Sequence, residues 1–224
     1  MPDDDSAPQK LTPELLLQAY QIGYFPMADD ATADEIYWVH PELRGVIPLD
    51  RFHISKSLRK TVRQDRYIVT SDTDFRTVMQ RCAEPQAGRR VTWINEQILE
   101  AYTGLFELGF AHSVETRTED GTLVGGLYGV SIGGAFFGES MFSRATDASK
   151  VALVHLVAKL RAGGYRLLDT QFQNDHLVQF GTMEVPADDY QILLADAVQT
   201  EADFAALPDQ MPGSTILQSI TQTS

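Results

Sequence analysis

The sequence predicts an α+β fold in which a mostly antiparallel sheet is covered by helices and follows a small N-terminal domain. Two segments, residues 123 to 130 and 135 to 141, are expected to form a hairpin, because the intervening Ser-Ile-Gly-Gly suits a tight turn. Residues 148 to 160 predict a helix that is apolar around most of its circumference and is therefore covered by protein. A further strand is expected over residues 165 to 172.

Composition places the chain among ordinary globular proteins. Its 224 residues are enough to bury a sizeable core, and 43% are hydrophobic while 22% are charged. No apolar run reaches the roughly 18 residues of a membrane span, and the acidic start MPDDDSAPQK is not a secretory signal. The single cysteine, Cys82, excludes an internal disulfide and favours a reducing compartment. We therefore expect a cytoplasmic monomer that does not act at a membrane.

The small N-terminal domain is expected to comprise residues 1 to 45, with a disordered start that offers little to bury. Its helix begins with Thr12 as the N-cap and Pro13 in the first position, and ends at Gly23. Three short segments after it are expected to be extended or to form strands: residues 24 to 27, 36 to 39 and 45 to 48.

The second domain is expected to comprise residues 46 to 204. The Asp120-Gly121 pair is a strong hairpin signal, and it indicates that residues 112 to 117 pair with the strand that follows. Further elements are expected as helices over residues 55 to 63, 74 to 82, 96 to 108 and 188 to 198, and a strand over 67 to 71. Residues 205 to 224 are predicted to be a weakly ordered tail.

Charge is distributed unevenly along the chain. The formal net charge is −13, yet residues 51 to 90 hold 10 basic and 4 acidic side chains, whereas residues 167 to 224 hold 0 basic and 9 acidic ones. Four cations share one side of the helix predicted over residues 55 to 63, where they repel one another unless an anion is near; they are Lys56, Arg59, Lys60 and Arg63. A solvated basic face is one interpretation, and a phosphate-binding patch is the other; clustering within an acidic chain favours the patch.

The strand over residues 165 to 172 carries a polar pair. Alternation along a strand places Asp169 and Gln171 on one side of the sheet. Burying an ionised carboxylate with an amide costs several kcal/mol, or about that order, unless both are hydrogen-bonded. Asp169 either ties down a neighbouring loop or forms, with Gln171, a ligand site at the carboxyl end of the strand.

The sequence gives little support for a nucleophilic cysteine, a metal site or a nucleotide-binding loop. Cys82 has no positioned histidine, and Asn174-Asp175-His176 is better explained as a turn that bonds its own backbone than as a metal site. There is no P-loop or dinucleotide fingerprint. No metal-ligand spacing relates the five histidines, which are His40, His53, His112, His155 and His176. We expect neither a metal nor a cofactor.

Three meandering strands, a buried helix and a following strand resemble acyltransferases of the GNAT type. Members that use coenzyme A usually have a glycine-containing pyrophosphate loop before the central helix. Residues 143 to 148 of this chain, Ser-Arg-Ala-Thr-Asp-Ala, contain no glycine. A coenzyme A-dependent N-acyltransferase on this scaffold is therefore an alternative rather than the first hypothesis.

A longer series of motifs resembles a specific family. In order, it comprises AYQIGYFP (19 to 26), HISKSLRK (53 to 60), TWI (92 to 94), LGFAHSVE (108 to 115), GGLYGV (125 to 130), FGESMFSR (137 to 144), ASK (148 to 150) and the Asp-x-Gln…NDH run (169 to 176). These segments are similar to bacterial leucyl/phenylalanyl-tRNA–protein transferases over about residues 12 to 198. The resemblance implies a GNAT-like domain after a small N-terminal one. It also implies transfer of Leu or Phe from charged tRNA to an N-terminal Arg or Lys, which marks the acceptor protein for degradation.

The resemblance also implies roles for particular residues. Asp169 and Gln171 would orient the attacking α-amine and assist its deprotonation, while Glu139 would hold the N-terminal region of the acceptor peptide. Trp93 would lie near the terminal adenosine, where stacking is worth about 1–3 kcal/mol. The basic residues Lys56, Arg59, Lys60 and Arg63 would hold the tRNA acceptor stem.

An apolar pocket for the aminoacyl side chain is implied as well. It would comprise Leu127, Phe136, Met141, Leu153, Leu156, Leu160 and Leu168. Ordinary core packing is the alternative for each of these residues. For the whole chain, the second alternative to transfer is a tRNA-binding module without catalytic activity.

Overall fold

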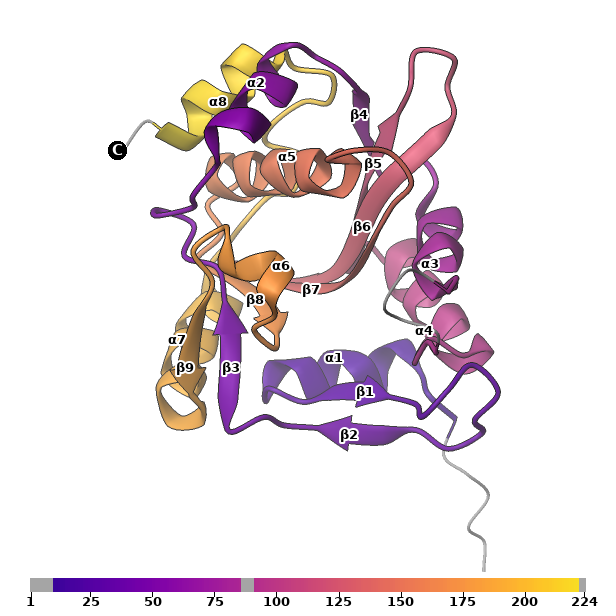
Figure 1. Ribbon diagram of the computed structural model, residues 1–224. Helices are drawn as coiled ribbons and strands as arrows, with labels where there is room; N and C mark the ends of the chain where they lie inside the picture. The colour runs from indigo at the N-terminus through magenta and orange to yellow at the C-terminus, as the bar shows by residue number, and fades with distance from the viewer. Residues whose placement is uncertain (1–9, 86–90, 222–224) are drawn as a thin grey trace, which may run out of the picture.

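The computed structural model describes residues 10–85 and 91–221 (Figure 1). Two sheets are present in these residues. A two-stranded sheet pairs β1 (Phe25–Met27) with β2 (Tyr37–Val39), and a seven-stranded sheet has the order β4-β5-β6-β7-β8-β3-β9. The large sheet consists of β3 (Leu43–Val46), β4 (Ile68–Ser71), β5 (Ala111–Arg117), β6 (Leu123–Ile132), β7 (Ala135–Ser143), β8 (Leu167–Gln171) and β9 (Met183–Pro186).

The large sheet is mostly antiparallel. Each neighbouring pair runs antiparallel except β7 and β8, which are parallel and are joined through a helix. A parallel pair requires such a crossover, because a hairpin turn joins only antiparallel strands. The predicted α+β class with a mostly antiparallel sheet is confirmed. The strand predicted over residues 45 to 48 was assigned to the small N-terminal domain, but β3 comprises Leu43–Val46 and lies inside the large sheet between β8 and β9.

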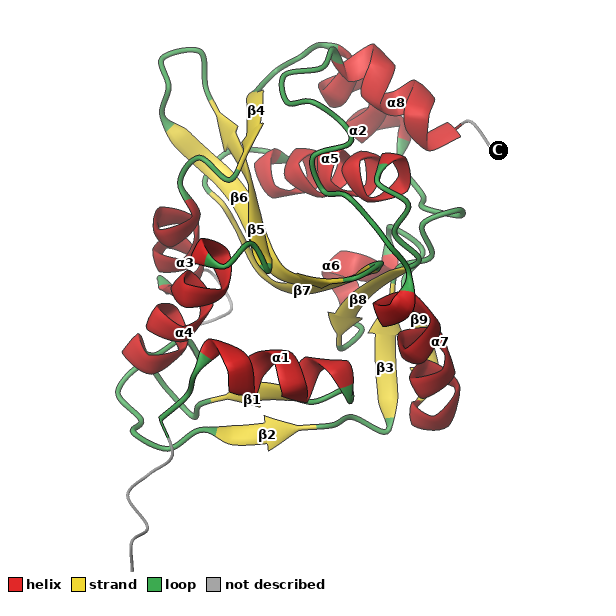
Figure 2. Cartoon of the chain, turned by 180° about the vertical axis from the view of Figure 1, so that it is seen from behind, coloured by secondary structure: helices red, strands yellow, loops and turns green. Residues whose placement is uncertain are grey.

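Helices cover both faces of the curved sheet (Figures 1 and 2). One core contains buried residues of α2 (Lys56–Arg63), α5 (Ala148–Ala162) and α8 (Gly213–Thr221), and the other contains those of α1 (Pro13–Gln21), α3 (Phe75–Ala83), α4 (Glu96–Glu107) and α7 (Ala187–Gln199). The short α6 (Asp175–Val178) follows β8. No helix within the described ranges is both long and apolar enough to cross a bilayer.

The helix α5 is buried around nearly its whole circumference, as the sequence predicted. Even His155 and Lys159 on this helix are buried, at 8% and 6% exposure. Burial lowers the pKa of His155 to about 4, so that this imidazole is neutral. α5 lies between the sheet on one side and α2 and α8 on the other, which explains why an amphipathic pattern is absent.

The segment after residue 204 corrects one prediction. We expected a weakly ordered tail, but α8 packs on α2 and α5 and buries Ile216, Leu217 and Ile220. Polar contacts support the approach to this helix, since Lys159 Nζ donates to Leu207 O at 2.8 Å and pairs with Asp209 Oδ1 at 2.9 Å. The sequence of this segment, with few charges and few apolar residues, does not reveal that it packs on two helices distant in the sequence, α2 and α5.

Candidate active site

A cavity of about 820 Å³ lies among β6, β7, β8, α5 and α6. Five of the seven predicted pocket residues form its apolar lining: Leu127, Met141, Leu153, Leu156 and Leu168. Trp93 and Glu139 line the same cavity, as the resemblance implied for a shared site. The polar part of the lining comes mainly from Ser140, Thr170, Asn174, Asp175 and His176.

Phe136 and Leu160 do not line this cavity. Both are fully buried in the core on the α5 side of the sheet. The ring of Phe136 stacks on Phe204 at a centroid distance of 5.9 Å and meets Tyr165 edge-on at 6.4 Å. These aromatic rings cover Phe136, so the alternative of ordinary core packing applies to it and to Leu160.

Glu139 reaches the cavity because β7 is bulged. Tyr128 pairs with Ser140 and Gly129 pairs with Gly138, so Glu139 is the extra residue between two paired positions. A bulge of this kind redirects a side chain and is common beside active sites. The sequence offered only the glycines of β6 and β7 as a hint of this irregularity.

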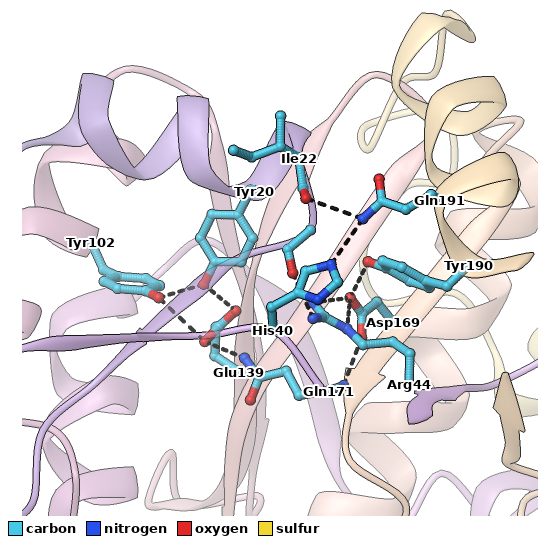
Figure 3. A network of polar contacts seen from close by, with 11 residues as sticks. Tyr20, Ile22, His40, Arg44, Tyr102, Glu139, Asp169, Gln171, Tyr190 and Gln191 are labelled. Atoms are coloured by element: carbon cyan, nitrogen blue, oxygen red, sulfur yellow. Dashed lines mark hydrogen bonds and ion pairs between the residues drawn. The ribbon is translucent and has the colours of Figure 1, made fainter. Parts of the chain in front are cut away.

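The Glu139 carboxylate is buried and hydrogen-bonded on both oxygens (Figure 3). Oε1 accepts from Tyr20 Oη at 2.6 Å, and Oε2 accepts from Gln171 Nε2 at 2.8 Å and from Tyr102 Oη at 3.3 Å. The two tyrosine hydroxyls also bond to each other. Burial raises the pKa of Glu139 to about 7, although the hydrogen bonds from Tyr20 and Gln171 act in the opposite direction. A carboxyl group with this pKa exchanges protons readily near neutral pH.

Asp169 is fully buried and forms an ion pair with Arg44 of β3. Arg44 Nε donates to Oδ1 and Oδ2 at 3.0 and 2.9 Å, and Nη2 donates to Oδ2 at 2.6 Å. Tyr190 Oη also donates to Oδ2, at 2.6 Å. Burial by itself would lower the pKa of Arg44, but the charge of Asp169 raises it above its ordinary value. The guanidinium of Arg44 is therefore charged in the folded protein.

Gln171 connects the two carboxylates. Its backbone N–H donates to Asp169 Oδ1 at 2.6 Å, while its side-chain Nε2 donates to Glu139. The residue has a φ of 64°, in the left-handed region that non-glycine residues seldom adopt. The structure thus brings Asp169, Gln171 and Glu139 together as predicted. Asp169, however, holds the backbone of Gln171, and the Gln171 amide bonds Glu139.

Sequence reasoning missed four members of this network, namely Tyr20, Arg44, Tyr102 and Tyr190. They come from α1, β3, α4 and α7, and no spacing in the sequence relates them. A weak signal did exist for Arg44, because it is one of only two basic residues among the first 50 in an otherwise acidic segment. A buried cation is a reasonable expectation for such a position only once a buried carboxylate is known.

The rim of the cavity contains the Asn174-Asp175-His176 segment. Asn174 Oδ1 accepts from Leu177 N at 3.0 Å and caps α6, so the segment bonds its own backbone as predicted, while Asp175 and His176 form the first residues of this short helix. Asp175 and His176 are exposed. Burial and the nearby charge of Lys150 lower the pKa of His176. Among the described residues, no group of three or more His, Cys, Asp or Glu side chains is arranged to hold a metal ion.

The predicted basic face is present on α2. Ser55 caps this helix by accepting from Leu58 N at 3.3 Å, and Leu58, Thr61 and Val62 are buried beneath it. Lys56, Lys60 and Arg63 are exposed, while Arg59 is half-buried and donates to Ile54 O. Within the part of the chain that the structure describes, no ion pair engages these four cations. The cluster is therefore available to an external anion.

An apolar cavity with a polar rim, beside a buried carboxyl group on a bulged antiparallel strand, is an arrangement typical of the ligand sites of α+β enzymes. Family models refine this class. Residues 9–42 match the leucyl/phenylalanyl-tRNA protein transferase N-terminal domain, and residues 46–195 match leucyl/phenylalanyl-tRNA protein transferase. The chain belongs to the leucyl/phenylalanyl-tRNA protein transferase family, whose members are aminoacyltransferases.

Individual relatives are similar over nearly their full length. The leucyl/phenylalanyl-tRNA–protein transferase of Rhodopseudomonas palustris (strain TIE-1) is 55% identical over 98% of both chains. That of Maricaulis maris (strain MCS10) is 58% identical over 94% of this chain and 97% of the relative. A solved structure, L-PGS from Bacillus licheniformis, is 13% identical with a TM-score of 0.40, covering 92% of this chain and 62% of that one.

Proposed function

We propose that this chain transfers Leu or Phe from aminoacyl-tRNA to the N-terminal Arg or Lys of an acceptor protein and so marks that protein for degradation. The observation that carries the proposal is the Glu139–Gln171 pair beside the apolar cavity. A GNAT-like architecture for residues 46 to 204, and a monomer acting in the cytoplasm, belong to the same proposal.

The donor side of the site is the apolar lining. Leu127, Met141, Leu153, Leu156 and Leu168 would enclose the aminoacyl side chain. Full burial of a leucine or phenylalanine side chain is worth about 1.5–3 kcal/mol, which favours these two amino acids over small or polar ones. Trp93, which lines the same cavity, would stack on the terminal adenosine.

The acceptor side is the acidic rim. The cavity lining contains two carboxylates, Glu139 and Asp175, and no lysine or arginine among the described residues. Asp175 is exposed and has no ion-pair partner within the described chain, whereas Glu139 is buried with a pKa of about 7. The exposed carboxylate of Asp175 at the rim would pair with the cationic Arg or Lys side chain of the acceptor. The α-amine of the same acceptor residue would then lie toward Glu139.

The reaction needs no covalent intermediate, because the aminoacyl ester of tRNA is already activated. The acceptor α-amine attacks the ester carbonyl carbon, a C–N bond forms, and the bond from that carbon to the tRNA ribose oxygen breaks. Ionised Glu139 accepts the proton that the amine loses, and this proton is finally delivered to the departing ribose oxygen. Gln171 orients the amine, and Asp169 acts by holding Gln171.

One polar atom of the cavity is suited to the ester. Thr170 Oγ1 is buried and has no hydrogen-bond partner within the described residues, and Thr170 lines the cavity. A buried hydroxyl without a partner costs about 1–3 kcal/mol. A bond from this hydroxyl to the carbonyl oxygen of the ester would recover that cost and stabilise the charge that develops there.

The basic face of α2 would bind the acceptor stem of tRNA. Lys56, Arg59, Lys60 and Arg63 present clustered positive charge in a chain with a net charge of −13. Contacts between cations and phosphates supply affinity that does not depend on sequence and falls with salt. A cationic surface is needed here, because the rest of the acidic chain repels nucleic acid.

The test is transfer of radiolabelled Leu and Phe, each supplied as charged tRNA, to peptides that differ only in an N-terminal Arg, Lys, Asp or Met. Label is expected on the Arg and Lys peptides only. Absence of transfer despite tRNA binding would contradict the proposal and support the tRNA-binding module. Stabilisation by acetyl-coenzyme A in a melting assay, with acetyl transfer to a peptide, would support the coenzyme A-dependent alternative.

A further inference from the structure

Arg44 lies between the two segments that match the family, since these end at residue 42 and begin again at residue 46. We propose that Arg44 is a positioning residue for the transfer reaction: it holds Asp169, and through Asp169 it holds the turn at Gln171 that directs the Gln171 amide toward Glu139. This inference rests on the proposed function for its kinetic consequences. Its structural consequence can be measured without any activity.

The first step concerns the state of Asp169. Both carboxylate oxygens are occupied, because Oδ1 accepts from Arg44 and from Gln171 N, and Oδ2 accepts from Arg44 and from Tyr190. Two parallel N–H bonds from a guanidinium hold a carboxylate in both position and orientation. Asp169 is fully buried and is not among the residues that line the cavity, whereas Glu139 lines it, so the acceptor amine in the cavity meets Glu139 and not Asp169. The contribution of Asp169 is therefore to geometry, and the proton goes to Glu139.

The second step concerns the backbone at Gln171. The left-handed conformation, with a φ of 64°, costs roughly 1–2 kcal/mol for a residue with a Cβ. The 2.6 Å bond from Gln171 N to Asp169 Oδ1 and the 2.7 Å bond from Phe172 N to Thr170 O stabilise this turn. Without the turn, alternation along β8 would continue, and the Gln171 amide would not be directed at Glu139 in the same way.

Gly45, the neighbour of Arg44, allows the close approach that this arrangement needs. Gly45 pairs with Gln171 across β3 and β8, and the register shifts between Gly45 and Val46. A Cβ on Gly45 would lie 2.7 Å from the backbone carbon of Phe172, which is too close. Arg44 and Gly45 therefore act as a pair: the glycine admits the turn, and the arginine holds the carboxylate that stabilises it.

The third step concerns what holds Arg44 itself. Its guanidinium lies between the rings of Phe25 and Tyr190, 4.7 Å from each centroid, and Nη1 donates to Gly23 O at 2.8 Å. Figure 3 shows how Gln191, on the same helix as Tyr190, bonds Ile22 O at the edge of this network. The N-terminal segment and α7 thus position Arg44. Through Arg44 and Asp169, these residues, which lie far from the reacting atoms, affect the conformation of Gln171.

A double-mutant cycle tests this chain of contacts. Arg44→Met keeps a long apolar side chain between the two rings, and Asp169→Asn removes the carboxylate charge. If Arg44 acts through Asp169, each single change lowers the single-turnover transfer rate by about 100-fold or more, and the double variant is no slower than Asp169→Asn alone. Arg44→Lys should recover part of the rate. The proposal would be overturned if the fold loss of transfer rate in the double variant equalled the product of the two single losses. Wild-type activity in Arg44→Met would also overturn it.

Lys159→Met is the matched control, because Lys159 is also a buried cation with a carboxylate partner, Asp209, but its partners lie in the C-terminal segment. This variant should lose stability and keep its transfer rate. An equal loss of transfer rate in Lys159→Met and Arg44→Met would mean that Arg44 has only a general structural role.

Hydrogen exchange at the Gln171 amide gives a readout that does not need activity. Exchange of this N–H, followed by NMR in the folded protein, should be about 100-fold faster in Arg44→Met and unchanged in Lys159→Met. Arg44→Lys keeps the positive charge, and its exchange rate at this N–H should lie between those of the wild type and Arg44→Met. Unchanged exchange in Arg44→Met would overturn the proposal. An inactive wild-type enzyme with the expected exchange pattern would instead contradict the proposed function and leave the positioning role of Arg44 standing.

Discussion

The carboxylates beside the cavity are buried and hydrogen-bonded, whereas the cations on α2 are mostly exposed to solvent. Asp169 is fully buried and bonded on both oxygens by Arg44, Gln171 and Tyr190. The side chains of Lys56 and Lys60 are exposed, and no ion pair engages them within the described chain. The buried charges are held in one geometry, whereas the exposed ones are free to follow a partner.

This difference separates two contributions to the reaction. Exposed charges attract a phosphate backbone over about 8–10 Å and are screened by salt. Buried charges, in a less polar environment, hold atoms in position and are screened much less. We therefore expect changes in the buried network to alter the rate of transfer and changes on α2 to alter the affinity for tRNA.

The largest effect is expected from Asp169→Asn. Loss of the carboxylate releases Gln171, and transfer to an Arg peptide should fall by about 1000-fold while the Kd for tRNA stays the same. Asparagine is the better choice over alanine, because its side-chain oxygen can still accept from Arg44, whereas Asp169→Ala leaves the buried guanidinium without a side-chain acceptor and costs about 3–5 kcal/mol in stability. Filter binding and single-turnover transfer measure the two quantities. A wild-type transfer rate in Asp169→Asn would show that the Asp169 carboxylate has no role in the reaction.

Reversal of three cations on α2 should give the next effect. The triple variant Lys56→Glu, Arg59→Glu, Lys60→Glu is expected to weaken tRNA binding by about 100-fold and to reduce the slope of log Kd against log salt by about 2–3. Among single changes, Lys60→Glu should weaken binding more than Arg76→Glu, an exposed cation on α3 that is paired with Glu96. An unchanged salt slope in the triple variant would mean that tRNA binds elsewhere.

Glu139 should show its raised pKa in the pH dependence of stability. A carboxyl group with a folded pKa of about 7 stabilises the fold fully below its unfolded pKa of 4.5, and this stability is lost as pH rises to 7. The free energy of unfolding of the wild type, relative to Glu139→Gln, should therefore fall by about 2–3 kcal/mol between pH 4.5 and 8. Urea unfolding at several pH values measures it. Parallel pH profiles would show that burial does not perturb Glu139.

The smallest effect is expected from Asp175→Asn. Loss of the rim charge should raise the KM for an Arg peptide by about 5-fold, equivalent to about 1 kcal/mol, with kcat and the KM for charged tRNA unchanged. Asp188→Asn is the matched control, because Asp188 also lies exposed in the first turn of a helix but outside the cavity. Equal KM values for the two variants would assign recognition of the acceptor to another group.

Sequence reasoning reached the elements with strong local signals. The hairpin of β6 and β7, the buried α5 and the basic face of α2 each follow from turn residues or periodicity within a short segment. The apolar lining was implied by the resemblance to the transferase family; five of its seven residues line the cavity, whereas Phe136 and Leu160 lie buried in the core. Whether an apolar residue lines a cavity or fills a core depends on what packs over it.

The hydrogen bonds around Glu139 and Asp169 could not be predicted from local sequence signals, and the reason is physical. Glu139 depends on a bulge, which exists only once β6 and β7 are paired. The partner of Asp169 is Arg44, 125 positions away in the sequence. The helices against which α8 buries its apolar side chains, α2 and α5, are likewise distant in the sequence, and the segment was therefore predicted to be a tail. Long-range pairing, rather than local propensity, determines all three.

The most direct test of the account compares two variants in two assays. Single-turnover transfer at saturating charged tRNA and the Kd for that tRNA would be measured for Asp169→Asn and for the triple reversal on α2. We predict that Asp169→Asn loses rate at normal affinity, while the triple reversal loses affinity and regains near-normal rate once tRNA is saturating. Loss of both quantities by both variants would contradict the separation of chemistry from tRNA binding.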